Sequence, residues 1–120
     1  MRARILNASA GSGKTYQLAY KYVRDVVEQP SIYRHILAVT FTNKATEEMK
    51  YRILKEIHLL ASGGESSYLE NLCRELDMDA ATVRRRAAEV RSKILHDYSR
   101  FTVLTIDTFF QRILRAFIKE

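Results

Sequence analysis

The sequence predicts an α/β fold in which helices surround a parallel β-sheet. Three short apolar runs suited to buried strands lie at residues 3–7, 35–41 and 101–106. Each run is followed at once by a polar turn and then by apolar residues at helical spacing. Strands that alternate with helices are typical of parallel sheets, because the chain must cross over between neighbouring strands. We therefore expect one domain over residues 1–120, with a helical insertion at 55–99 between the second and third strands.

The first strand, predicted at residues 3–7, leads into a helix that we place at about 14–27. The apolar stripe of this helix comprises Leu18, Tyr22, Val23, Val26 and Val27. Pro30 and Ser31 end the helix. Between strand and helix lies a glycine-rich turn that comprises Ala8, Ser9, Ala10, Gly11, Ser12, Gly13, Lys14 and Thr15.

A strand, a glycine-rich turn and a helix together are the setting of a phosphate-binding P-loop. Glycine lets the backbone turn tightly and direct several N–H groups at one anion, and the start of the helix adds its positive dipole end. Lys14 supplies a cation for the β- and γ-phosphates, and the Thr15 hydroxyl suits Mg²⁺. We therefore predict that residues 8–15 bind ATP and Mg²⁺, with Lys14 and Thr15 in the catalytic roles. The alternative is an ordinary glycine turn, because Ala8 stands where the strict pattern has glycine.

The second unit begins with the nearly continuous apolar run at 35–41, which is typical of a strand buried in a parallel sheet. Asn43 is placed to cap the helix that follows. That helix has a regular apolar stripe and ends at a glycine pair. The stripe is Met49, Ile53, Ile57 and Leu60, and the pair is Gly63 and Gly64.

Two more helices are predicted before the third strand. One covers residues 66–77, and Asp79 caps a longer one. The stripe of the longer helix comprises Val83, Ala87, Val90, Ile94 and Tyr98. The run at 101–106 is rich in β-branched residues and predicts the third strand. Asp107 or Thr108 then caps a last helix, whose apolar side comprises Phe110, Ile113, Leu114 and Phe117.

The polar turns after the three strands are expected to share one surface, because the carboxyl ends of parallel strands meet at the same edge of a sheet. The second turn, residues 40–44, combines the hydroxyl of Thr40, the ring of Phe41 and the cation of Lys44. An aromatic ring there can stack on an unpaired base, while hydroxyls and a lysine can hold phosphates. The alternative is that Phe41 is a core residue and Asn43 only a helix cap.

The sequences around the three turns resemble known motifs. Residues 11–15 followed by 38–49 look like motifs I and Ia of superfamily 1 helicases of the UvrD/Rep type. Residues 103–112 are similar to the later motif of that family, in the form used by RecB-like and AddA-like helicase-nucleases. The resemblance implies a RecA-like P-loop NTPase sheet, with this chain as the N-terminal part of motor domain 1A. It also implies ATP-driven translocation on single-stranded DNA and unwinding of duplex DNA.

The resemblance further implies which residues bind. Residues 11–14 cradle the phosphates and Thr15 holds Mg²⁺. Many members of the family have histidine where this chain has Asp107, and an acid beside a phosphate is unfavourable, so we expect Asp107 to cap the helix instead. The DNA-facing set comprises Thr40, Phe41 and Asn43, the neighbouring cation Lys44, and Thr105 and Phe109 of the later motif.

The composition favours an anionic partner. The chain has 20 basic and 14 acidic side chains, which gives a net charge of +6 at pH 7. The single cysteine excludes an internal disulfide, and the 3 histidines are too scattered for a metal motif. We expect a cytoplasmic protein without membrane contact, whose partners are DNA and a second subunit of a helicase-nuclease complex. A DNA-facing patch or a solvated helix face is formed by Arg84, Arg85, Arg86, Arg91, Lys93 and Arg100.

Helicases of this type also use a strand that ends in Asp-Glu and a second motor domain, and neither is evident in the 120 residues. Phosphoryl transfer to water needs such a carboxylate near Mg²⁺. We therefore expect the chain to be a segment of a longer motor protein and to be inactive alone. Two other functions stay open: a P-loop kinase that acts on a nucleotide or small molecule, and a nucleotide-binding module without catalysis.

Overall fold

The computed structural model of the chain describes residues 4–7 and 12–119. Its strands are β1 (Arg4–Asn7), β2 (Ile36–Thr40) and β3 (Thr102–Thr105), and they pair in parallel in the order β1-β2-β3. The Cα atom of Ala38 in the middle strand lies opposite Leu6 on one side and Val103 on the other. The predicted parallel sheet is therefore confirmed for the described residues, and the larger RecA-like sheet stays a prediction.

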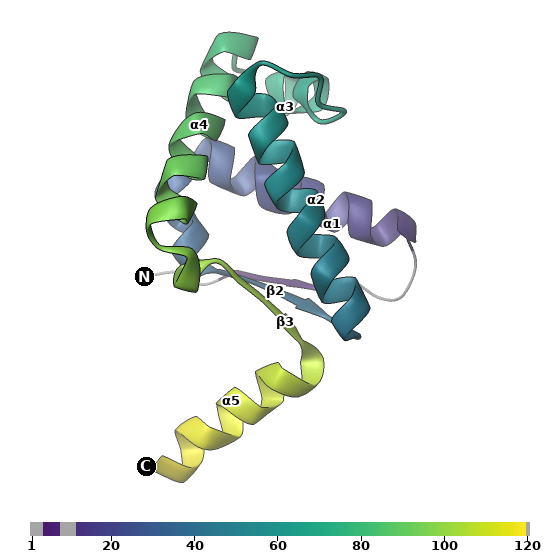
Figure 1. Cartoon of the computed structure of the whole chain (residues 1–120), viewed down its shortest axis with the longest axis vertical. Helices are drawn as coiled ribbons and strands as arrows, with labels where there is room; N and C mark the ends of the chain where they lie inside the picture. Colours follow the sequence, from purple (N-terminus) through teal and green to yellow (C-terminus); the bar gives the residue numbers. More distant parts are fainter. Residues whose placement is uncertain (1–3, 8–11, 120) are drawn as a thin grey trace.

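The helices account for most of the chain. They are α1 (Ser12–Glu28), α2 (Asn43–Ser62), α3 (Leu69–Leu76), α4 (Ala80–His96) and α5 (Ile106–Lys119). Two 3-10 turns, Pro30–His35 and Tyr98–Arg100, lead into β2 and β3. Figure 1 shows α1, α2, α3 and α4 gathered beyond one side of the sheet, whereas α5 extends away from the other.

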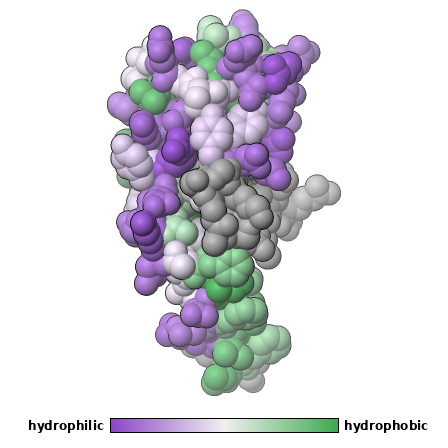
Figure 2. Space-filling view, turned by 90° about the vertical axis from the view of Figure 1, so that its right-hand side faces the viewer, coloured by the Kyte–Doolittle hydropathy of each residue, from purple (hydrophilic) through white to green (hydrophobic). Residues whose placement is uncertain are grey.

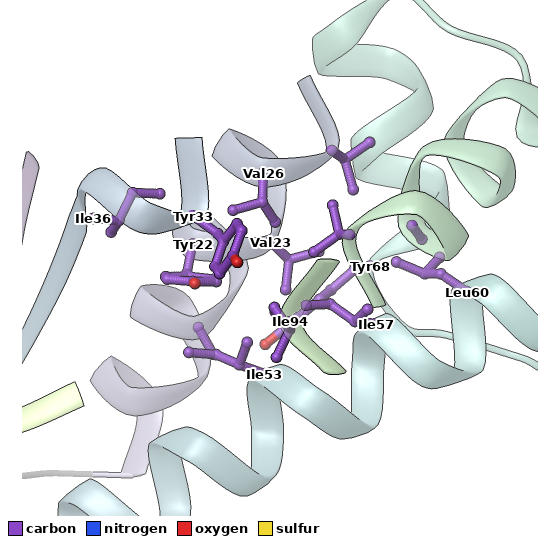
Figure 3. Close-up of a cluster of buried hydrophobic side chains, with 14 of the residues drawn as sticks. Tyr22, Val23, Val26, Tyr33, Ile36, Ile53, Ile57, Leu60, Tyr68 and Ile94 are labelled. Carbon is purple, nitrogen blue, oxygen red and sulfur yellow. The ribbon is translucent and has the colours of Figure 1, made fainter. Parts of the chain in front are cut away.

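The hydrophobic core lies mainly between α1, α2 and α4, where side chains from all three helices meet (Figure 3). The apolar stripes predicted for α1 and α2 are buried, and so is the α4 stripe from Val83 to Ile94. Helices that bury a continuous stripe gain most of their stability from this packing. The prediction that Tyr98 is the last member of the α4 stripe is wrong, because α4 ends at His96 and Tyr98 is 50% exposed.

Some of the helix caps predicted from the sequence are confirmed and others are wrong. Asp79 caps α4 as predicted, because its carboxylate accepts the backbone N–H of Thr82 at 2.8 Å. Gly63 ends α2 as predicted, with a left-handed φ of 84° that glycine adopts without strain. Asn43 is not the cap of α2: the Thr42 hydroxyl accepts the N–H of Ala45 at 3.0 Å, and Asn43 is the first helical residue.

The start of α5 also differs from the prediction. The helix begins at Ile106, so Asp107 and Thr108 lie in its first turn and neither is its cap. Instead, the hydroxyl oxygen of Thr105 lies 3.3 Å from the N–H of Thr108 and accepts it. The third strand is correspondingly shorter than predicted, because the helical conformation begins before the apolar run ends.

α5 carries an apolar side that the described part of the chain leaves open to solvent. Phe110, Leu114, Phe117 and Ile118 are 54%, 59%, 74% and 81% exposed. Figure 2 shows that hydrophobic surface gathers at the lower end of the molecule, where α5 lies in Figure 1. The predicted apolar stripe of this helix is therefore present, but it does not pack into the core formed by α1, α2 and α4.

Two arginines of α4 point at the carbonyl ends of other helices. The guanidinium of Arg84 donates to the carbonyl oxygens of Leu60 at 3.1 Å and Gly64 at 3.0 Å, where α2 ends. The guanidinium of Arg86 donates to the carbonyl oxygen of Glu28 at 2.6 Å, where α1 ends. Carbonyl groups in the last turn of a helix lack helical partners, so these two cations stabilise helix ends. They are therefore not simply part of a solvated face.

We expect Arg84→Met to lower the free energy of unfolding by about 1–2 kcal/mol, because it keeps the apolar stem but leaves these carbonyl groups without their charged donor. Urea denaturation of the 120-residue polypeptide measures the change. Arg85→Met is the matched control, since Arg85 is exposed on the same helix and loses the same charge. Equal losses of stability in the two variants would contradict the capping role of Arg84.

Candidate nucleotide and nucleic-acid site

The strands that precede the three predicted turns all end at the carboxyl edge of the sheet. β1 ends at Asn7, β2 at Thr40 and β3 at Thr105. The register pairs Asn7 with Val39 and Thr40 with Thr105, so the strands end almost level with one another. The carboxyl edge of an open parallel sheet is where such folds bind their ligands. The structure therefore brings the second and third turns together beside the end of β1, the strand that precedes the predicted P-loop.

The predicted P-loop is described from Ser12 onward. Ala8, Ser9, Ala10 and Gly11 lie outside the described residues. Ser12, Gly13, Lys14 and Thr15 form the first turn of α1. The first N–H groups of a helix have no helical partners and, with the helix dipole, favour an anion. The backbone of this part of the chain thus suits the predicted phosphate site.

Thr15 borders a small cavity between α1 and α2. The cavity has a volume of about 150 Å³ and is lined by Thr15, Tyr16, Glu48, Tyr51 and Arg52. The guanidinium of Arg52 lies over the Tyr16 ring, 5.3 Å from its centroid. A hydroxyl and a cation therefore border the same hollow at the start of α1. That chemistry fits an anionic ligand, although the negative charge of Glu48 would repel it.

The turn after β2 is fixed by a small network of hydroxyl groups. Thr40 is only 2% exposed, and its hydroxyl lies 2.6 Å from that of Thr46. The Thr46 hydroxyl donates to the carbonyl oxygen of Thr42 at 3.1 Å. Thr40 thus supports the turn from within, so the surface of the turn is formed by the residues that follow it.

Phe41, Asn43 and Lys44 are those surface residues. β2 ends at Thr40, and Phe41 is 53% exposed, so the alternative that Phe41 is a core residue is wrong. Asn43 and Lys44 are also exposed, in the first turn of α2. An exposed ring beside an amide and a cation can stack on a base and hold a phosphate.

The third turn contributes fewer exposed groups. Thr105 is half-buried, and its hydroxyl caps α5. Phe109 is also half-buried, and its ring centroid lies 6.0 Å from that of Phe110. Asp107 is exposed in the first turn of α5, where its negative carboxylate interacts favourably with the positive end of the helix dipole.

A tyrosine cluster beside the first turn of α1 was not predicted. Tyr16, Tyr20 and Tyr68 border a larger cavity of about 560 Å³ between α1 and α3. Burial and the hydrogen bond to the Glu75 carboxylate raise the pKa of Tyr20 to about 12. Burial raises the pKa of Tyr68 still further, so its hydroxyl stays protonated and can donate. The spacing of Tyr16 and Tyr20 places them on one face of α1, but the sequence does not show that Tyr68 joins them.

A metal site formed by protein side chains alone is not found in the described part of the chain, where no three histidine, cysteine or acidic residues come together. Among the helices within residues 4–7 and 12–119, none combines the length and the apolar character needed to cross a membrane.

Comparison with known proteins gives a consistent result. The family model of the UvrD/REP helicase N-terminal domain matches residues 2–120. The chain is 30% identical over 119 residues to the RecBCD enzyme subunit RecB of Escherichia coli (strain K12), which covers 92% of this chain and 10% of that protein. It is also 30% identical over 110 residues to an ATP-dependent helicase/nuclease subunit of Lactobacillus helveticus (strain DPC 4571), covering 87% of this chain and 9% of that protein.

A further relative is the RecBCD enzyme subunit RecB of Haemophilus influenzae (strain ATCC 51907 / DSM 11121 / KW20 / Rd), which is 29% identical over 133 residues. That alignment covers 94% of this chain and 10% of the relative. The chain thus spans about a tenth of the length of the curated relatives it matches. No solved structure matches the chain.

Proposed function

Because the chain belongs to the UvrD/REP helicase N-terminal domain family, we propose that it is the ATP-binding segment of a larger, cytoplasmic DNA helicase that moves along single-stranded DNA. In this proposal residues 1–120 form the N-terminal part of motor domain 1A, and residues 55–99 are a helical insertion within it. The relatives are helicase-nuclease and RecBCD subunits. The proposed partners therefore include duplex DNA and a second protein chain of such a complex.

The observation that supports this function most strongly is that the three strands preceding the predicted turns end nearly level at one sheet edge. The start of α1, the turn after β2 and the turn after β3 follow strands that end nearly level. One edge can therefore bind a nucleotide through the first turn of α1 and a DNA strand through the exposed Phe41 and Lys44. Because the two proposed sites are close together, a change from ATP to ADP can alter the affinity for DNA.

The residues at that edge have different proposed roles. Backbone N–H groups of the P-loop, the Lys14 ammonium and the Thr15 hydroxyl would hold MgATP, which supplies the phosphoryl group whose transfer to water releases energy. Thr40 and Thr46 keep the next turn in shape through their hydroxyl pair. Phe41, Asn43 and Lys44 then face the DNA, and Thr105 fixes the start of α5, which carries Phe109.

We expect the whole protein that contains this chain to hydrolyse ATP faster when single-stranded DNA is present. The measurement is phosphate release with and without an oligonucleotide, together with DNA affinity in the presence of ADP and of a non-hydrolysable ATP analogue. A helicase should change its DNA affinity between the two nucleotides. Hydrolysis that ignores DNA, combined with phosphate transfer to a small molecule, would instead support a P-loop kinase and overturn the proposal.

A further inference from the structure

We propose that Tyr68 is a positioning residue for the nucleotide site, which holds the first turn of α1 from the connection between α2 and α3. Tyr68 lies far from the start of α1 in the sequence but contacts Tyr16 near that start in the fold. This inference rests on the proposed function, because it assigns a task to Tyr68 in nucleotide binding. The task is indirect, since Tyr68 acts on the site through Tyr16.

The first observation is a hydrogen bond to the backbone of α1. The hydroxyl of Tyr68 donates to the main-chain carbonyl oxygen of Tyr16 at 2.8 Å. In an α-helix that oxygen also accepts the N–H of the residue four positions later, here Tyr20. Tyr16 directly follows Thr15, which is the residue predicted to bind Mg²⁺. The hydroxyl of Tyr68 therefore anchors the helix at the residue that adjoins the proposed site.

The second observation is that α1 is held by aromatic contacts on the same face. The ring of Tyr68 lies edge-to-face with the rings of Tyr16 and Tyr20, at centroid distances of 5.0 and 5.1 Å. Tyr16 also donates its hydroxyl to Ser67 at 2.9 Å and lies under the guanidinium of Arg52. The side chain of Tyr16 is thus held between α2 and the connection to α3, while its backbone is held by Tyr68.

The third observation is that Tyr68 is itself fixed in place. It is only 1% exposed, and its backbone N–H donates to the Ser66 hydroxyl at 3.1 Å. The Ser66 hydroxyl in turn donates to the Glu56 carboxylate at 2.7 Å, and Glu56 is buried in α2. A continuous series of contacts therefore runs from the interior of α2 through Ser66 and Tyr68 to the first turn of α1.

A rigid anchor matters at this position because backbone N–H groups bind a phosphate only when several point at it together. A misplacement of about 1 Å at a site of this kind can cost a large factor in binding or rate. Residues 12–15 form the first turn of α1, directly before Tyr16, and the first amides of the helix have no helical acceptor to keep them in place. The bond from Tyr68 restrains that turn from the side, before a nucleotide arrives.

The test uses the whole protein that contains this chain, with Tyr68→Phe as the variant. This change removes the hydroxyl but keeps the buried ring. Tyr20→Phe is the matched control, because it removes the hydroxyl that binds Glu75 from the same aromatic cluster without touching the Tyr16 carbonyl. The measurements are KM and kcat for ATP hydrolysis with single-stranded DNA, melting temperature, and amide hydrogen exchange by mass spectrometry.

We expect Tyr68→Phe to raise the KM for ATP about fivefold, with kcat changed less than about twofold. Hydrogen exchange should rise in the segment covering residues 12–20 but not in α4, which lies in the core away from this bond. Tyr20→Phe should leave both readouts near those of the unchanged protein. If the Tyr68 variant also melts at a lower temperature, the ratio of exchange in the first turn of α1 to exchange in α4 still decides.

A KM within twofold of the unchanged protein, or exchange that rises equally in α1 and α4, would show that Tyr68 is only a core residue. Lys14→Ala separates this result from a failure of the proposed function. If Lys14→Ala removes hydrolysis while Tyr68→Phe has no effect, only the positioning role of Tyr68 is wrong. If Lys14→Ala leaves hydrolysis intact, the proposed phosphate site itself is wrong.

Discussion

Replacing Lys14 with alanine should lower ATP hydrolysis by about a hundredfold or more and abolish unwinding by the whole protein that contains this chain. Lys14 belongs to the first turn of α1, directly before Thr15. A P-loop lysine places its ammonium group on the β- and γ-phosphates, where negative charge must be stabilised during phosphoryl transfer. Alanine keeps the helix but removes that charge.

Two assays measure the effect: phosphate release in the presence of single-stranded DNA, and separation of a fluorescently labelled duplex. Lys21→Ala is the control, because Lys21 is exposed on the same helix and is also a lysine. Its loss should change neither assay strongly. A Lys14→Ala protein that still hydrolyses ATP at the normal rate would mean that Lys14 is not the phosphate ligand and that the proposed phosphate site is wrong.

The fold was largely predictable because burial follows regular spacing. Met49, Ile53, Ile57 and Leu60 recur at helical intervals, and all four are buried in α2. The same holds for α1 and for α4 up to Ile94. A stripe of this kind predicts a helix and also predicts which face of that helix packs into the core, so one pattern indicates both secondary structure and packing.

The ends of the elements were less predictable, because neighbouring residues offer similar chemistry. Thr42 and Asn43 are both good helix caps, and only the backbone conformation decides between them. Thr42 has the extended φ and ψ of −131° and 159° that a cap adopts, so the helix begins one residue later. Likewise, Thr105 competes with Asp107 and Thr108 at the start of α5 and is the residue that accepts the N–H of Thr108.

Contacts between side chains far apart in the sequence could not be predicted from the sequence. Arg84 and Arg86 looked like part of a basic patch, yet each binds the carbonyl end of a helix distant in the sequence. Tyr68 and Tyr16 are separated by 52 residues but share a hydrogen bond. Such pairs depend on how the helices pack, and that packing has no local signal. The motifs predicted to bind phosphate and DNA could be proposed from the sequence because their residues are close together in the chain, and these roles stay predictions.

Phe41→Ala should weaken the binding of single-stranded DNA to the whole protein by about fivefold to a hundredfold, because stacking of a base on an aromatic ring contributes about 1–3 kcal/mol. Phe41 is suited to stacking because it is 53% exposed at the carboxyl end of β2 and is followed by the exposed cation of Lys44. The loss should be similar for oligonucleotides of different sequence, since every base has a face on which a ring can stack.

Fluorescence anisotropy with labelled oligonucleotides measures the affinity, and thermal denaturation checks the fold. Tyr98→Ala is the matched control: Tyr98 is similarly exposed, at 50%, but precedes β3 and so lies toward the opposite edge of the sheet. We expect the control to bind DNA normally and the melting temperature of Phe41→Ala to change little, since the ring is outside the core. Unchanged DNA affinity in Phe41→Ala would mean that DNA does not bind at the end of β2. A loss of affinity in Phe41→Ala but not in Tyr98→Ala would mean that the DNA strand binds at the same sheet edge as the proposed nucleotide site at the start of α1.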